Sequence, residues 1–567
     1  MSSAPEQKKL HKNESIKVNS VNLRGTLSEE LNDNSTGSIC ADSAQLSKFH
    51  GMYMQDDRDI RAERRKKKLE KAFSFMLRVR IPAGVVSSEQ YLKLDQLADD
   101  YANGMIRLTT RQTIQYHGLL KGNIRNLIRG MDEVGVDSIG ACGDINRNVM
   151  AYNNVSNEKT RLEMHTYARK ISEQFMPEGK AYYDLFIDGE KVTTEAEVEP
   201  IYGKTYLPRK FKIGIAVPPS NDVDVFSQDL GLIAIYKGDK LEGFNISAGG
   251  GMGTTHGNTK TFARVADVLG FVKPEDVHKV AEAIVTTQRD FGDRTDRAHA
   301  RLKYTIADRG VEWFIGEVES RSGVTFEKAR EFKFETIVDD FGWHKDVNGD
   351  WYYGQFIASG RIKDTAECQM KKAFQEIAKI HVGDWRMTGS QNMVICGVSE
   401  GSKAAIEKIL ADHGVPGPET LSGLRKNALA CVALPTCGLA LAESERALPS
   451  VIDDIEDILD EVGLRETDIS IRMTGCPNGC ARPFLGEIGF VGKAPGKYNM
   501  YLGANYEGLR LNTLYAESIK VDEALEKLKP IIKQYAAERE EGERFGDFCV
   551  RKEIVTIAEK DSVKLSF

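Results

Sequence analysis

Apolar and polar residues alternate in short stretches separated by turns from about residue 73 onward. Residues 73–81 (FSFMLRVRI) have the alternation of a strand, and a Pro-Ala-Gly turn and a helix beginning near Ser88 are expected to follow. The preceding residues are rich in Ser, Asn, Lys and Glu, with little apolar periodicity. We therefore predict that residues 1–70 form a flexible extension or partner arm and that the folded body begins near Ala72.

The pattern of residues 75–119 recurs at residues 351–398. Each stretch predicts a strand, a turn, a helix and then an Arg-x-Thr step (Arg107 and Thr109; Arg386 and Thr388) into a second strand. Further strands predicted at 210–217, 230–237 and 243–251 have counterparts at 469–476, 487–493 and 498–505. Duplication followed by divergence explains this order economically, although chance similarity between common strand–helix–strand units is the alternative. A duplicated chain tends to place one ligand site between its halves.

Length and charge set broad limits on the class of protein. A chain of 567 residues predicts two to four domains. The formal net charge of -7 argues against bulk nucleic-acid binding. Residues 58–68 are locally basic, and a solvated helix face is favoured there over a nucleic-acid or partner patch.

Targeting signals are not evident in the sequence. It contains no apolar run of about 18 residues, which disfavours a membrane-spanning helix. The first residues lack an apolar core followed by a small-residue cleavage site, and their glutamates disfavour a transit peptide. We expect a cytoplasmic protein.

The strongest local signal is a group of four cysteines. Cys431 and Cys437 form a C-x5-C pair, and Cys476 and Cys480 form a C-x3-C pair. Zinc ribbons usually use a C-x2-C knuckle, whereas iron–sulfur cubes tolerate wider spacing because each thiolate binds a different iron. An iron–sulfur cluster is therefore favoured, with buried apolar cysteines or a structural zinc site as alternatives.

Basic residues form a second constellation. Arg78 alternates with Arg80, and Lys210 alternates with Lys212, in segments that read as strands, so each pair is expected on one face. Two neighbouring cations are costly to bury unless an anion binds to them. The alternative is that each pair lies on an exposed edge strand, where water solvates the charges. Further basic residues lie in polar segments: Arg107, Arg111, Arg147, Arg209, Arg289 and Lys303. Together they predict a strongly anionic ligand.

The glycine-rich run Ser247–Asn258 lacks the G-x-G-x-x-G spacing of a dinucleotide site, and close approach of backbone to a flat ligand explains it equally well. Together with the cysteine spacing, the motifs RLTTRQTIQYHG, NRNV, YLPRKFK, TTQRD, GDRTDR, TGCPNGC and VGKAPGKYN occur in order between about residue 50 and the C-terminus. In these features the chain closely resembles the sirohaem-dependent sulfite and nitrite reductase family.

The resemblance implies an α+β, multidomain and internally duplicated architecture with mixed sheets. A two-part ferredoxin-like domain is expected at residues 71–140 plus 343–418. A first reductase repeat is expected at 141–342, and a second, carrying the cluster cysteines, at 419–567.

The resemblance also implies two cofactors and the residues that hold them. A 4Fe-4S cluster is expected on Cys431, Cys437, Cys476 and Cys480, with Cys480 bridging to the iron of a sirohaem. Arg78, Arg147, Lys210 and Lys212 are expected to line the distal, catalytic pocket. The residues expected around the macrocycle carboxylates are Arg107, Arg111, Gln115, His117, Arg209, Arg289 and Lys303.

The reaction implied is the six-electron reduction of sulfite to hydrogen sulfide in sulfur assimilation and cysteine biosynthesis. Retention of both Lys210 and Lys212 favours sulfite, since relatives acting on nitrite typically relax this pair. The electron donor implied is a flavoprotein NADPH-dependent reductase subunit rather than ferredoxin. Two alternatives remain, a sirohaem nitrite reductase and a zinc-stabilised module that binds nucleic acid or protein.

Overall fold

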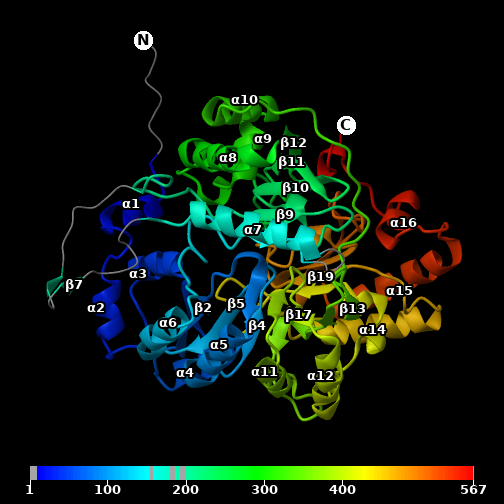
Figure 1. The fold of residues 1–567 in the computed structure, drawn as a ribbon, viewed down its shortest axis with the longest axis horizontal. Coiled ribbons are helices and arrows are strands. Elements are labelled where there is room, and N and C mark those ends of the chain that lie inside the picture. Colours follow the sequence, from blue (N-terminus) through cyan, green and yellow to red (C-terminus); the bar gives the residue numbers. More distant parts are fainter. Residues whose placement is uncertain (1–8, 154–157, 179–185, 188–189, 192–198, 566–567) are drawn as a thin grey trace.

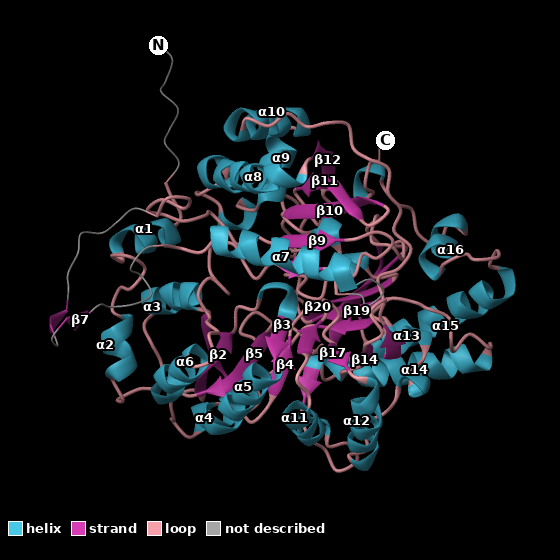
Figure 2. Cartoon of the chain, viewed as in Figure 1, coloured by secondary structure: helices cyan, strands magenta, loops and turns pink. Residues whose placement is uncertain are grey.

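Four five-stranded sheets organise the chain, and helices cover their outer faces (Figure 2). The computed structural model describes residues 9–153, 158–178, 186–187, 190–191 and 199–565. A small hairpin, β7 (Phe186–Ile187) with β8 (Glu190–Lys191), stands apart from the four sheets. Among the described residues no helix combines the length and apolar character needed to cross a membrane.

The first two sheets repeat one strand order. The first sheet has the order β1-β2-β5-β4-β15 and the second has the equivalent order β13-β14-β17-β16-β3. Their strands are β1 (Met52–Asp56), β2 (Phe73–Arg78), β3 (Val85–Ser87), β4 (Ile106–Leu108), β5 (Ile114–Leu119), β13 (Gly342–Lys345), β14 (Trp351–Gln355), β15 (Arg361–Ile362), β16 (Asp384–Met387) and β17 (Met393–Val398). The last strand of each order comes from the other half of the duplication, so the two halves exchange a strand.

The helices of these halves are also equivalent. They are α5 (Ser88–Tyr101) and α6 (Ile124–Asp132) in the first half, and α11 (Met370–Ile380) and α12 (Glu400–Asp412) in the second. Helix α5 begins where the sequence predicts, because Ser87 Oγ accepts the Gln90 N–H at 3.1 Å while Gln90 Oε1 accepts the Ser87 N–H at 3.0 Å. This capping box satisfies two N–H groups at the helix start.

The other two sheets form a second repeated pair. The order β6-β9-β10-β11-β12 matches the order β18-β19-β20-β21-β22, and in both the first three strands are parallel and the rest antiparallel. Their bounds are β6 (Met150–Ala151), β9 (Ile213–Ala216), β10 (Leu230–Lys237), β11 (Lys240–Ala248), β12 (Asp267–Val272), β18 (Ala428–Ala430), β19 (Ile471–Thr474), β20 (Ile488–Ala494), β21 (Lys497–Leu502) and β22 (Thr513–Ile519). The α+β, internally duplicated architecture expected from the sequence is confirmed.

Helices accompany each of these repeats. In the first they are α7 (Glu158–Gln174), α8 (Val277–Phe291), α9 (Leu302–Arg309) and α10 (Val311–Ser322). In the second they are α13 (Gly423–Lys426), α14 (Leu448–Glu461), α15 (Val521–Glu538) and α16 (Phe545–Arg551). Figure 1 shows α8–α10 at one end of the molecule and α11 and α12 at the other.

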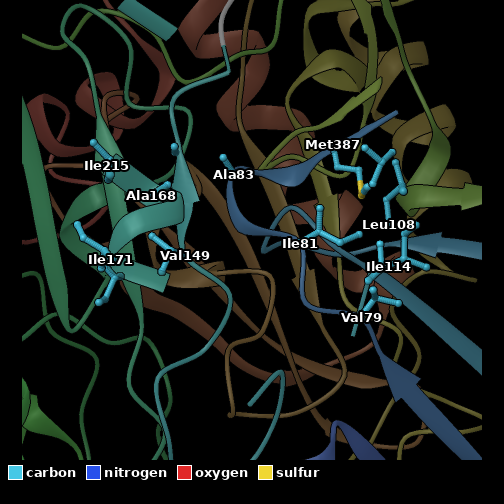
Figure 3. Packing of buried hydrophobic residues seen from close by; sticks show 14 of the residues in the cluster. Val79, Ile81, Ala83, Leu108, Ile114, Val149, Ala168, Ile171, Ile215 and Met387 are labelled. Atoms are coloured by element: carbon cyan, nitrogen blue, oxygen red, sulfur yellow. The ribbon is translucent and has the colours of Figure 1, made fainter. Parts of the chain in front are cut away.

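The largest apolar core joins the first repeat to both ferredoxin-like halves. Figure 3 shows two parts of it, with Val79, Ile81, Leu108 and Ile114 gathered on one side, and Val149, Ile215, Ala168 and Ile171 on the other. Burying each such side chain contributes roughly 1.5–3 kcal/mol. The second repeat has a separate core between its sheet and α14 and α15.

The N-terminal segment departs from expectation. Residues 9–70 contain α1 (Lys12–Asn19), α2 (Leu27–Asn32), α3 (Ala41–Leu46), strand β1 and α4 (Arg61–Lys66). Strand β1 pairs along its whole length with β2, and Leu23, Leu46 and Phe49 are buried in the main core. The prediction of a flexible extension is therefore wrong for the described residues 9–70, because a few apolar side chains suffice to anchor a mostly polar segment; residues 1–8 lie outside the described part.

Candidate functional site

The four cysteines lie where two parallel strands of the second repeat end. Cys431 directly follows β18, and Cys476 follows β19 after Gly475. Because β18 and β19 are parallel neighbours, their carboxyl ends meet at one edge of the sheet. The Gly475 N–H points at Cys431 Sγ at 3.4 Å, and a side chain at Gly475 would clash with Ala433 and the Ala442 carbonyl. Glycine thus lets the two cysteine loops approach each other.

The thiols of this group act on one another electrostatically. Burial, followed by the nearby charge of Cys480, raises the pKa of Cys431 and Cys437, and raises that of Cys476 to about 11. These three thiols are unfavourable as thiolates until a metal centre supplies positive charge. Within the described ranges no three or more His, Cys, Asp or Glu side chains are placed to hold a single metal ion. The spacing suits a cube with a separate iron for each sulfur better than one tetrahedral zinc.

Lys210 and Lys212 lie just before β9, with Phe211 between them. Burial and neighbouring cations, including Arg209, lower the pKa of Lys210 to about 7, and burial and Lys210 lower that of Lys212 strongly. The charge of Cys480 opposes both shifts, so its thiol lies within electrostatic range of both ammonium groups. In the part of the chain that the structure describes, no carboxylate forms an ion pair with either lysine.

Arg147 reaches the same region through a backbone bridge. Its N–H donates to the carbonyl of Phe211, the residue between the two lysines, at 2.9 Å. Its guanidinium is held by the Gly143 carbonyl at 3.0 Å from Nε and 2.8 Å from Nη2. Arg147 is therefore fixed beside the lysines by neutral acceptors, which leave its positive charge uncompensated.

Two more arginines surround this group. Burial, together with the charges of Arg147 and Arg482, lowers the pKa of Arg111 to about 9. Arg111 donates to Gln228 Oε1 at 2.9 Å and to the Asn148 carbonyl at 2.5 Å. Arg209 is half-buried, and burial and Arg297 lower its pKa to about 10.

The first sheet supplies the opposite wall. Arg78, at the end of β2, lies across from Gln115 of β5, whose amide oxygen accepts from Arg78 Nε at 3.1 Å and whose nitrogen donates to His117 Nε2 at 3.3 Å. Burial and the charges of Arg107 and Arg78 lower the pKa of His117 to about 3, so its ring is neutral. Burial tends to lower the pKa of Arg78, but Cys142, Tyr53 and Cys480 raise it overall.

Arg107 connects this wall to the cysteine loops. Its Nη2 lies 2.7 Å from Glu445 Oε2, although its Nε has no hydrogen-bond partner despite being buried. Burial lowers its pKa against the opposing charges of Glu445, Cys431 and Cys480.

The glycine-rich run lies against the second cysteine loop. Thr254 N–H donates to the Pro477 carbonyl at 2.7 Å, and a side chain on Gly479 would contact the Met252 carbonyl. Lys303 Nζ is held by the Gly253 carbonyl at 2.7 Å and the Gly251 carbonyl at 3.1 Å. Lys303 therefore fixes the glycine run in place.

Two predicted positions fall elsewhere. Arg289 lies at the end of α8, where it pairs with the adjacent Asp290 at 2.7 Å and donates to the Ile201 carbonyl at 2.6 Å. Strand β2 ends at Arg78, so Arg80 does not share its face; instead Arg80 pairs with Asp137 at 2.6 Å. Neither residue joins the cations around Cys480, because each has a local carboxylate.

Several residues of the site were missed in the sequence. Glu445 compensates Arg107, and Asn148 donates to the Ile81 carbonyl at 2.7 Å and the Arg111 carbonyl at 2.9 Å, joining two walls. Asp229 pairs with Arg301 at 2.8 Å, and the following residue, Leu230, donates its N–H to the Lys212 carbonyl at 3.1 Å. Asn148 was detectable from its place in NRNV, but Glu445 and Asp229 lie in no marked motif.

The site fits the two expected cofactors. Buried or half-buried cations without carboxylate partners converge from two sheets, that of β2, β4 and β5 and that of β6 and β9, and buried Nε atoms of Arg107 and Arg111 lack hydrogen-bond partners. A macrocycle that carries several carboxylates supplies the missing acceptors. The cysteine group beside it supplies four sulfur ligands for a cluster.

Comparisons with known proteins identify the family of the chain. Residues 167–326 match the nitrite and sulphite reductase 4Fe-4S domain, and residues 67–134 and 344–413 match the nitrite/sulfite reductase ferredoxin-like half domain. The sulfite reductase (NADPH) hemoprotein beta-component of Staphylococcus carnosus (strain TM300) is 55% identical over 94% of this chain and 94% of its own length. The corresponding protein of Shouchella clausii (strain KSM-K16) is 52% identical over 96% of each chain.

A solved structure supports the architecture independently. The structure of Mycobacterium tuberculosis NirA protein covers 99% of this chain and 98% of its own, with a TM-score of 0.76 at 22% identity. That likeness shows the fold alone. The family is shown by the hemoprotein beta-components, which are 55% and 52% identical to this chain over nearly its full length. The chain therefore belongs to the nitrite and sulfite reductase family.

Proposed function

We propose that this chain is a sulfite reductase hemoprotein subunit that reduces sulfite to hydrogen sulfide in sulfur assimilation and cysteine biosynthesis. The observation that carries the proposal is the pair Lys210 and Lys212, which lies within electrostatic range of Cys480 without an ion-pair partner in the described structure. An oxyanion bound between them gains charge-assisted hydrogen bonds in a site where water is largely excluded. When bound, the sirohaem and the 4Fe-4S cluster supply the electrons.

The distal residues bind the substrate and hold protons for the departing oxygens. Arg78 and Arg147 are always charged and bind the anion. Lys210, with a pKa of about 7, holds a proton at Nζ that it can release near neutral pH. Lys212 is a second ammonium donor beside it, and an approaching anion favours its charged form.

The remaining cations orient the macrocycle. Arg107, Arg111 and Arg209 offer guanidinium groups to its carboxylates, and Gln115 with His117 supports Arg78. Lys303 acts through the glycine run rather than directly, since its ammonium group donates to three backbone carbonyls. Arg289 is left out of the proposed site, because its guanidinium is paired with Asp290.

The proposal includes the organisation around this site. The ferredoxin-like domain spans residues 71–140 and 343–418, and the two reductase repeats span 141–342 and 419–567. Electrons come from a flavoprotein NADPH-dependent reductase subunit, and the protein works in the cytoplasm. The names of the relatives, which specify NADPH and a beta-component, support a separate flavoprotein partner.

The test is the absorption spectrum and metal content of the purified protein, followed by turnover with a reduced artificial donor. Sirohaem bands, about five irons per chain and faster turnover of sulfite than of nitrite are expected. Faster turnover of nitrite would overturn the substrate assignment. A colourless protein that contains zinc and no iron would overturn the proposal as a whole.

A further inference from the structure

A basic segment, residues 61–68, projects from the surface next to the cysteine site. It comprises α4, which has no buried residue, and the two lysines that follow. Arg61 and Lys67 are paired with Asp56 and Glu63. Arg65, Lys66 and Lys68 are exposed and form no ion pair with the described residues, although the whole chain is acidic.

The residues just before this segment are bonded to the loop that carries Cys437. The Arg58 N–H donates to the Pro435 carbonyl at 3.3 Å, and its Nη1 donates to the Ala440 carbonyl at 2.6 Å and the Cys437 carbonyl at 3.3 Å. Asp59 pairs with Arg446 at 2.8 Å. The basic segment is thus held in a fixed position relative to the cysteine site.

Apolar side chains are exposed in the same place. Leu439, two residues after Cys437, is 64% exposed, and Leu441 is 37% exposed. Ile60 and Leu69 flank the basic segment at 38% and 51% exposure. An apolar centre beside a rim of one charge is typical of a protein interaction surface.

We propose that these residues form a docking surface for an acidic face of the electron-donating flavin domain. The surface consists of Arg65, Lys66 and Lys68 with Ile60, Leu69, Leu439 and Leu441. This inference rests on the proposed function and adds to it the place where the partner binds. The sequence favoured a solvated helix face for this segment, and its fixed position against the Cys437 loop now favours a binding role.

Both the chemistry and the charge fit a transient complex. In each encounter the reduced flavin loses one electron and the cluster gains one, and no bond is formed or broken. The Cys437 loop brings cluster ligands to the surface, so a flavin docked there is close to the acceptor. Opposite charges on the two partners accelerate and orient such encounters, and salt weakens them.

The test uses the holoprotein with Arg65→Glu, Lys66→Glu and Lys68→Glu combined. We expect binding to the reduced flavoprotein subunit, measured at low salt by surface plasmon resonance, to weaken by at least about tenfold, with a matching loss in the stopped-flow rate of cluster reduction. Turnover with reduced methyl viologen should stay unchanged, since a small donor needs no docking surface. Leu439→Ser is a second variant. It should also weaken binding to the flavoprotein and leave turnover with methyl viologen unchanged, and the loss of binding should depend less on salt.

The matched control reverses three exposed lysines elsewhere, with Lys237→Glu, Lys240→Glu and Lys273→Glu in the first repeat, whose strands β10–β12 lie at the end of the molecule opposite α4 (Figure 1). If both triple variants bind the flavoprotein equally well, the docking surface is wrong while the proposed function stands. If the unmodified holoprotein does not reduce sulfite even with methyl viologen, the proposed function itself fails.

Discussion

Asp224 and Arg482 occupy equivalent positions in the two reductase repeats and form a buried ion pair with each other. Each has a left-handed backbone, with φ of 46° and 52°, and each precedes a 3-10 helix, Val225–Ser227 or Pro483–Leu485. Arg482 also donates to the Thr110 carbonyl at 2.9 Å and the Gly389 carbonyl at 3.0 Å, in equivalent turns of the two ferredoxin-like halves. One ion pair therefore joins all four repeated units.

Replacing Asp224 should destabilise the protein strongly. Asp224→Asn leaves Arg482 and Arg472, which bonds to Asp224 at 2.6 Å, buried without a carboxylate. Removing one partner of a buried ion pair costs about 3–5 kcal/mol. We expect a lower midpoint in urea unfolding, followed by circular dichroism. Asp453→Asn, which breaks an exposed pair with Arg425, should cost no more than about 1 kcal/mol; equal losses would contradict the central role of Asp224.

The paired lysines should be needed for turnover but not for cofactor binding. In the variant Lys210→Ala with Lys212→Ala, kcat/KM for sulfite should fall by at least about 100-fold, since two donors of charge and protons are removed. The sirohaem and cluster absorption should remain. The control, Lys237→Ala with Lys240→Ala, removes two exposed lysines from the ends of β10 and β11. Normal sulfite turnover in the Lys210 and Lys212 variant would refute their assigned roles.

The cysteine site can be tested by metal content. Cys431→Ala removes one sulfur ligand, so the purified protein should contain clearly fewer than about five irons per chain and lack the cluster signal in electron paramagnetic resonance. Cys549→Ala is the matched control, because Cys549 is in the second repeat too but is buried in its apolar core. Full iron content in Cys431→Ala would exclude Cys431 as a ligand.

Glu487 should make stability depend on pH. Its carboxylate accepts the Gly546 N–H at 2.9 Å and the Ser470 N–H at 2.8 Å, and burial raises its pKa from 4.5 to about 7. Between these two pKa values the folded chain holds a proton that the unfolded chain has released. The free energy of unfolding therefore falls as pH rises and levels off above about pH 7. The total loss is roughly 3 kcal/mol.

The variant Glu487→Gln cannot titrate, so it should lose this slope. Urea midpoints measured between pH 5 and pH 8 give the comparison, with Glu526→Gln as the exposed control. A slope in Glu487→Gln equal to that of the unmodified protein would assign the pH dependence to other groups.

The internal repeat and the cysteine loops were predictable because both depend on local patterns. Strand alternation, the Arg-x-Thr step and the spacing of Cys431 and Cys437 are all encoded within short segments. The fold confirms the repeat strand by strand, with β9, β10 and β11 matching β19, β20 and β21.

Relationships between distant segments were not predictable in the same way. Arg107 and Arg386 look alike in sequence, but Arg107 lies across from Gln115 whereas Arg386 lies across from Val394. Each arginine faces the residue eight positions later, so the register is the same and the different facing residues distinguish the surroundings. The pairing of Arg289 with Asp290 was also not foreseen, because the sequence alone makes this cation available for a ligand.

Because the two ferredoxin-like halves exchange β3 and β15, neither sheet can be completed until the second half has been synthesised. Strand β4 leaves the ribosome well before β15, and β3 well before its partner β16. At roughly 5–20 residues per second, the nascent first half waits on the order of tens of seconds with unpaired strand edges. Such edges attract other chains, so they need shielding until translation has passed residue 387. The two halves therefore mature together, and a message cut short between them yields a product prone to aggregation.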